Sequence, residues 1–299
     1  MFIVMQQVLQ LVLFAAVGYI LCKSGKIKSE HTKLLSTLHV YLFLPCTVIN
    51  TYAANFTVAY IREKYPLLLA SIIIIILTIV LGSLISRLLT RHPYQRVVYS
   101  YSLAFSNYGF FGYPLVEGLF GSLALQNAMI FALPISLCTN TWGYATLTKT
   151  EMKLKRLLSP VVWATLIGAV LGLTGLKLPA VLTSLISKSA ACMAPVGMLL
   201  AGMVVSEFDF LSLLKGKNNY IIAALRLLVI PCAIALSLKL LGMESMVLTA
   251  LMMHAMPCGM NTIVFPRLVD EDCRAGASMT LISSLLAIVA VPLLVAIFN

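Results

Sequence analysis

The sequence has 299 residues, of which 61% are hydrophobic and 10% are charged, and its mean hydropathy is +1.00. Because about a quarter of the residues in a soluble domain are charged, this composition excludes a soluble protein and predicts an all-α integral membrane protein. The formal net charge is +11, but the basic residues occupy short loops without a soluble domain, so we expect the lipid bilayer as a partner and no nucleic acid.

Ten apolar segments are candidates for transmembrane helices, each of which needs about 20 apolar residues. In chain order they are Val4–Leu21, Leu34–Ala54, Pro66–Leu89, Val97–Gly121, Leu123–Leu147, Leu157–Leu176, Ala190–Val205, Tyr220–Leu241, Met246–Leu268 and Ala275–Phe298. The first segment lacks a basic region before it, so we expect a retained helix rather than a cleaved signal. The sequence therefore predicts ten transmembrane helices.

The distribution of lysine and arginine predicts the orientation of these spans. Fifteen of the 21 basic residues fall on one side of the membrane, five fall on the other, and Arg226 falls within a span. The positive-inside rule then places the Lys149–Arg156 loop in the cytoplasm and both termini outside it. We expect a multi-pass protein of the cell (plasma) membrane with extracytoplasmic termini.

Two of the apolar segments contain residues that interrupt a helix. The fourth contains the run Asn107–Pro114, with two glycines and a proline, and the ninth contains Ala255–Thr262, with Pro257 and Gly259. Backbone groups released from a helix at membrane depth are tolerated only where protein or a water-filled cavity satisfies them. The pair therefore indicates a binding site, and the alternative is two proline kinks that bind nothing.

The interruptions recur at a fixed offset in the two halves of the chain. Asn107 and Pro257 lie 150 positions apart, and so do Pro45 and Pro195, which we interpret as hinges in the second and seventh spans. Because each half has five spans, the second half lies inverted in the membrane relative to the first. We expect two inverted five-helix repeats, residues 1–150 and 151–299, joined around Thr148–Ser159.

Motifs for catalysis are missing from the sequence. It contains no GxxxxGK[ST], HExxH or GxSxG motif, and its seven cysteines and four histidines are scattered without metal-ligand spacing. We therefore expect no enzyme, no metal and no cofactor.

A few polar residues within the spans are further candidates. Arg226 either pairs with an anionic substrate or a carboxylate, or reaches the cytoplasmic interface. His254 lies one turn before Pro257 and is either a hydrogen-bonding group of the site or a packed core residue. Asn140 is either a substrate ligand or a partner for a neighbouring helix.

The two five-helix halves, the Asn107–Pro114 run and the Met256–Thr262 run resemble the auxin efflux carrier family over nearly the whole chain. The resemblance implies a fold like that of PIN carriers and bile acid:sodium symporter homologues. In that fold spans one, two, six and seven form a scaffold, spans three to five and eight to ten form a transport domain, and the fourth and ninth spans cross at their breaks. The family motif has two prolines or small residues where this chain has Cys258 and Gly259.

The resemblance also implies a secondary carrier of small organic anions such as auxin, malate or malonate, with binding roles for Asn107, Pro114, Pro257 and Asn261. A helix N-terminus carries a partial positive charge, which favours a carboxylate at the breaks independently of the resemblance. A channel-like or sensory membrane protein is the alternative function. Coupling to H⁺ or Na⁺ and a homodimer through the scaffold helices stay open. The full set of expected substrate-binding residues is Asn107, Gly109, Gly112, Pro114, Asn140, His254, Pro257, Gly259 and Asn261.

Overall fold

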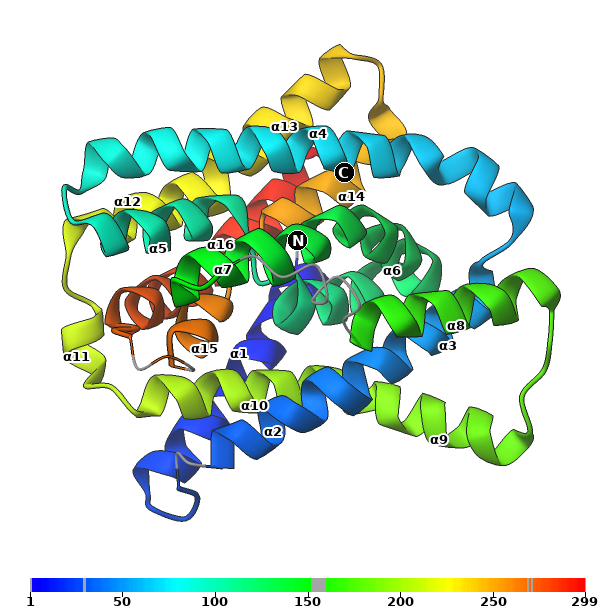
Figure 1. Cartoon of the computed structure of the whole chain (residues 1–299), viewed down its shortest axis with the longest axis horizontal. Helices are drawn as coiled ribbons and strands as arrows, with labels where there is room; N and C mark the ends of the chain where they lie inside the picture. The colour runs from blue at the N-terminus through cyan, green and yellow to red at the C-terminus, as the bar shows by residue number, and fades with distance from the viewer. Residues whose placement is uncertain (1, 29–30, 152–159, 268, 270, 299) are drawn as a thin grey trace.

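The computed structural model describes residues 2–28, 31–151, 160–267, 269 and 271–298 (Figure 1). In this part of the chain the regular structure is helical, with one isolated antiparallel bridge between Ser106 and Cys258. Seven helical segments are long and apolar enough to cross a membrane: Phe2–Lys23, Thr32–Asn55, Val58–Leu89, Tyr108–Thr148, Ala180–Ser206, Lys217–Leu240 and Arg274–Phe298. The all-α class is confirmed, while the count of ten spans stays a prediction.

The described residues of the first half of the chain form seven α-helices and three wide π turns. The helices are α1 (Phe2–Lys23), α2 (Thr32–Leu38), α3 (Leu44–Asn55), α4 (Val58–Leu89), α5 (Pro93–Ala104), α6 (Tyr113–Cys138) and α7 (Tyr144–Thr148); the turns are η2 (His39–Phe43), η3 (Tyr108–Gly112) and η4 (Thr139–Gly143). Gly121, with a φ of +81°, divides α6 into two runs. The predicted boundary between the fourth and fifth spans falls at this glycine.

In the second half, residues 160–267 and 271–298 form nine α-helices. They are α8 (Pro160–Thr174), α9 (Ala180–Ala191), α10 (Met193–Ser206), α11 (Phe210–Leu213), α12 (Lys217–Ala224), α13 (Ile230–Leu240), α14 (Glu244–His254), α15 (Asn261–Arg267) and α16 (Arg274–Phe298), with the wide turn η6 (Leu225–Val229) between α12 and α13. The first predicted interruption separates α5 from η3 and α6, and the second separates α14 from α15.

Three of the wide turns end immediately before a proline-containing helix start. A proline ring clashes with the carbonyl four residues earlier and supplies no N–H group. Widening the preceding turn by one residue relieves this clash, because the last N–H group then bonds five residues back. In η2 the Leu44 N–H group donates to the His39 carbonyl oxygen, just before Pro45. The same bond joins Tyr113 to Tyr108 before Pro114 in η3, and Ile230 to Leu225 before Pro231 in η6.

The helices pack in two groups. In one group α1 packs along α10, and α3 packs against α8 and α9; in the other, α4 packs against α5 and α6, α12 against α16, and α13 against α14. The groups also contact each other, because α1 packs against α16 and both α1 and α3 contact α6. Figure 1 shows α4 and α5 towards one edge of the molecule and α2, α9 and α10 towards the opposite edge. The first group corresponds to the expected scaffold and the second to the expected transport domain, a division that stays a prediction.

Glycines bring the backbones of α1 and α10 into direct contact. A Cβ atom at Gly202 would lie 1.7 Å from the carbonyl oxygen of Ala15, and one at Gly18 would lie 2.1 Å from that of Leu199. Both contacts are with backbone, which cannot rotate away. Only glycine therefore allows this helix pair to approach so closely.

We predict that Gly202→Ala forces α1 and α10 apart and destabilises the protein by about 1–3 kcal/mol or more, the usual range for overpacking. The measurement is the apparent thermal midpoint of purified protein in one detergent. Gly118→Ala is the matched control, because its new methyl group would meet only the end of the flexible Gln7 side chain, at 2.8 Å. Equal midpoints for the two variants would show that the glycine contact is unimportant.

Candidate functional site

The two helix interruptions lie side by side and are joined through their backbones. Ser106 and Cys258 form the antiparallel bridge, and the Asn107 N–H group donates to the carbonyl oxygen of Pro257 at 2.8 Å. Asn107 is 4% exposed, and Pro257 and Cys258 are buried. The structure thus brings together two runs of sequence that lie about 150 residues apart. We call the place where Ser106 and Asn107 meet Pro257 and Cys258 the junction.

Arg226 stabilises the end of α5 at this junction. It is 0% exposed, and its Nη1 atom donates to the carbonyl oxygens of Leu103 and Ala104 at 2.9 and 3.4 Å. These carbonyls lie at the negative C-terminal end of α5, where a cation is favourable. Arg226 therefore does not reach the cytoplasmic interface, so that interpretation of the sequence is wrong.

Two of the three guanidinium nitrogens of Arg226 lack a hydrogen-bond partner in the described part of the chain. Its Nε and Nη2 atoms are buried and have no hydrogen-bond partner among the described residues. The ion pairs found in this part of the chain join Lys64 to Glu63 and Lys149 to Glu271, so none of them involves Arg226. A buried guanidinium without a carboxylate partner is costly, which makes a negatively charged ligand favourable nearby.

Serine hydroxyl groups satisfy further backbone groups freed by the second interruption. Ser106 Oγ donates to the carbonyl oxygen of Met253 at 2.6 Å, near the end of α14. The Cys258 N–H group donates to Ser283 Oγ of α16 at 2.9 Å. The C-terminal ends of α5 and α14 thus both have hydrogen-bond donors.

The start of η3 is different, because its first backbone donors are unpaired. The N–H groups of Tyr108, Gly109 and Phe110 make no hydrogen bond within the described residues, whereas those of Phe111 and Gly112 both donate to the Asn107 carbonyl oxygen at 3.1 Å. A Cβ atom at Gly109 would meet nothing within 4 Å. Open space therefore lies beside Gly109, one of the three residues whose N–H groups are unpaired.

The side-chain amides of the three predicted asparagines differ in their contacts. Asn107 makes no side-chain cap hydrogen bond. Asn261 Nδ2 donates to the Tyr101 hydroxyl at 3.1 Å. Asn140 Nδ2 donates to Ser136 of its own helix, to the carbonyl oxygen at 2.9 Å and to Oγ at 3.3 Å. Of the three, Asn107 has the amide that is most available to a ligand.

The glycines Gly112 and Gly259 lie against the opposite interruption. A Cβ atom at Gly112 would lie 3.1 Å from Met256 Cγ, and one at Gly259 would lie 3.4 Å from the carbonyl oxygen of Ser106. Pro114 is the second residue of α6. These positions therefore shape the junction.

His254 and the two predicted hinges make no hydrogen bond to the start of η3 in the described part of the chain. His254 is buried with its ring edge against Phe131 at 5.9 Å, and neither ring nitrogen has a partner in the described part of the chain. Pro45 follows η2 and Pro195 follows the interruption at Cys192 between α9 and α10. Whether these prolines act as hinges stays a prediction.

Several residues of the junction did not emerge from the sequence. Ser106 is adjacent to the predicted run and had a local signal, since serine often satisfies backbone groups at helix ends. Tyr101 and Ser283 contribute through contacts between distant segments, for which the sequence pattern provides no signal.

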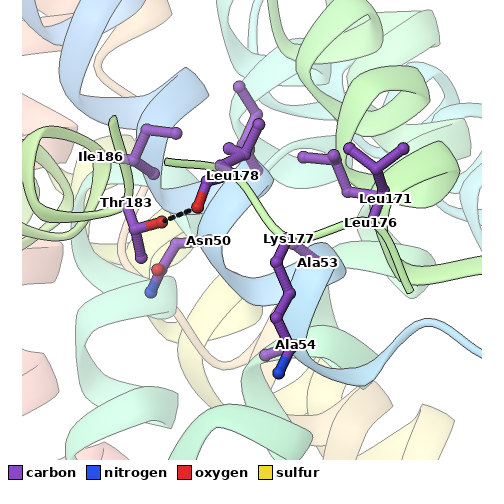
Figure 2. Close-up of a pocket in the computed structure, with 10 residues that line it drawn as sticks. Asn50, Ala53, Ala54, Leu171, Leu176, Lys177, Leu178, Thr183 and Ile186 are labelled. Atoms are coloured by element: carbon purple, nitrogen blue, oxygen red, sulfur yellow. Dashed lines mark hydrogen bonds between the residues drawn. The ribbon is translucent and has the colours of Figure 1, made fainter. Parts of the chain in front are cut away.

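A cavity of about 370 Å³ lies elsewhere, between α3, the α8–α9 connection and α9 (Figure 2). Its lining is mainly aliphatic, with Asn50, Lys177 and Thr183 as polar residues. None of the predicted binding residues lines this space. The cavity is therefore separate from the junction.

Comparison with known proteins identifies the family. A family model described as "Membrane transport protein" matches residues 3–154 and, again, residues 144–295. This chain belongs to the membrane transport protein family, that of the auxin efflux carriers. Similar proteins include an uncharacterized transporter of Methanocaldococcus jannaschii, 27% identical over 97% of both chains, and an uncharacterized transporter of Methanothermobacter thermautotrophicus, 24% identical over 96% of both. The chain is a multi-pass membrane transport protein rather than an enzyme.

We predict that substitutions at two adjacent residues of the junction destabilise the protein to different extents. Ser106→Ala leaves the buried carbonyl of Met253 without this donor and costs about 1–3 kcal/mol, whereas Asn107→Ala removes an amide that caps nothing and costs less than about 0.5 kcal/mol. The apparent thermal midpoint of each purified variant measures the difference. A larger loss for Asn107→Ala than for Ser106→Ala would contradict this assignment of roles.

Proposed function

We propose that this transport protein is a secondary carrier for a small organic anion, which binds at the junction of the two helix interruptions. The observation that carries the proposal is the buried guanidinium of Arg226, which pairs with no carboxylate among the described residues. It lies beside the first interruption, where the start of η3 presents N–H groups that are unpaired within the same part of the chain.

The electrostatics of the junction favour a single negative charge. Two helical segments begin there, η3 with α6 and the short α15, and two end there, α5 and α14. Each start contributes up to about +0.5 charge and each end about −0.5, so the four terms nearly cancel. Arg226 then leaves a net charge of about +1 in a medium of low dielectric constant, where its influence extends further than in water.

The donors at the start of η3 match a carboxylate. Its oxygens accept hydrogen bonds from backbone N–H groups at a helix start, and the helical run from η3 to Phe120, which Gly121 ends, gives that start a dipole of its own. The Asn107 amide adds a side-chain donor at the same point. The described part of α15 has only seven residues, which is too short for a comparable helix dipole. We therefore assign the carboxylate to the η3 side.

We further propose ten spans in two inverted repeats with crossing fourth and ninth spans, extracytoplasmic termini, and movement of the transport domain against the scaffold. The twofold match of one family model along the chain supports the repeat. The two packing groups of helices support the division into domains. In such an arrangement the junction lies on the moving side, and its exposure alternates between the two faces of the membrane.

The test is counterflow in proteoliposomes preloaded with unlabelled malonate, malate or indole-3-acetate, with the same radiolabelled acid outside. We expect transient accumulation of at least one acid and no competition by the uncharged analogue malonamide. Asn107→Ala should weaken the apparent affinity several-fold to about a hundredfold, the range for one hydrogen bond to a carboxylate.

Asn50→Ala is the matched control, because Asn50 lines the separate cavity and not the junction. It should transport as the unmodified protein does. Uptake that equilibrates without counterflow would indicate a channel instead, and equal effects of the two asparagine substitutions would remove the junction from the binding site.

A further inference from the structure

His39 is a buried histidine that contacts the first interruption from another part of the molecule. It begins η2, the wide turn that precedes Pro45, and it is 1% exposed. Neither of its ring nitrogens has a hydrogen-bond partner among the described residues. Burying an imidazole without such partners is unfavourable, so its packing has to supply the compensating interaction.

That packing is a stack on Phe110 of η3. The two ring centroids lie 4.2 Å apart, and the rings are inclined by 14°. Phe110 also carries one of the three unpaired N–H groups at the start of η3. The imidazole therefore contacts the same short turn that we assign to the anion.

Gly197 of α10 forms the third side of this contact. A Cβ atom there would lie 3.0 Å from His39 Cε1 and 3.0 Å from Phe110 Cδ1, closer than side chains normally pack. A residue larger than glycine would press against both rings. Three segments thus meet at one point: η2, η3 and α10.

We propose that His39 is a positioning residue, which holds the first interruption against the scaffold in this conformation and releases it when the transport domain moves. The proposal rests on the proposed function, because His39 and Gly197 belong to the expected scaffold and Phe110 to the expected transport domain. A contact present in one of two conformations shifts their populations by the free energy of that contact.

A histidine suits a contact that has to open. Stacking of aromatic rings stabilises the closed contact, while the two ring nitrogens bind water once the contact opens and so limit the cost of exposure. Phenylalanine would keep the stack but would expose a purely apolar ring on opening. Alanine would remove the stack altogether.

The experiment is hydrogen–deuterium exchange of the purified full-length protein, followed on the peptide that contains the amides of Phe111, Gly112 and Tyr113. The first two of these amides bond to Asn107 and the third to Tyr108. His39→Ala should speed their exchange about two- to tenfold, the change expected from losing one aromatic pair. Gly197→Ala should also speed it, because the new methyl group presses on both rings.

Two comparisons make the result specific. His39→Phe should exchange at the original rate or more slowly, because it restores the stack. His31→Ala, a change at an exposed histidine outside the contact, should leave the rate unchanged. Unchanged exchange in His39→Ala would overturn the proposal, and so would exchange in His39→Phe as fast as in His39→Ala. Uniform acceleration that includes α4 would mean general destabilisation and would also overturn it. Because no substrate is present, a negative counterflow result leaves this test intact.

Discussion

The structure depends on one constraint: backbone groups released from a helix inside an apolar protein need partners within that protein. At the junction these backbone groups have three kinds of hydrogen-bond partner. The interruptions bond to each other from Asn107 to Pro257, Arg226 serves the end of α5, and Ser106 serves the end of α14. Once the helix ends are satisfied in this way, the N–H groups at the start of η3 remain unpaired within the described residues, with open space beside Gly109. We therefore place the candidate site at the start of η3, where the backbone N–H groups lack such partners among the described residues.

Two contrasting contacts suggest how such a molecule combines rigidity with movement. The seam between α1 and α10 consists of backbone against backbone at Gly18 and Gly202, which leaves no space for sliding. The contact of the first interruption with η2 and α10, in contrast, includes a flat aromatic stack over a glycine. Flat apolar surfaces separate without breaking hydrogen bonds. The fold therefore places an adaptable contact beside the candidate site and a fixed one within the scaffold group.

Much of this arrangement was predictable because it depends on residues with strong local effects. Prolines and glycines interrupt helices wherever they occur in apolar segments, so the breaks near Asn107 and Pro257 followed from the sequence, and the wide turns before Pro45 and Pro114 have the same local cause. The roles of Arg226 and His39 were not predictable. Arg226 bonds to carbonyls more than 120 residues away and His39 stacks on a ring about 70 residues away, and no periodicity or spacing encodes such contacts.

The central claim is that the charge of Arg226, rather than its hydrogen bonds alone, makes the junction favourable for an anion. The direct measurement is the affinity for indole-3-acetate, which carries one negative charge, by isothermal titration of folded protein, for Arg226→Lys and Arg226→Gln. Lysine keeps the positive charge. Glutamine removes the charge but keeps a hydrogen-bond donor for the α5 carbonyls. A charge about 8 Å from the anion at an effective dielectric constant of about 20 contributes ~2 kcal/mol, so glutamine should weaken binding roughly thirtyfold and lysine should weaken it far less. Equal affinities for the two variants would contradict the account.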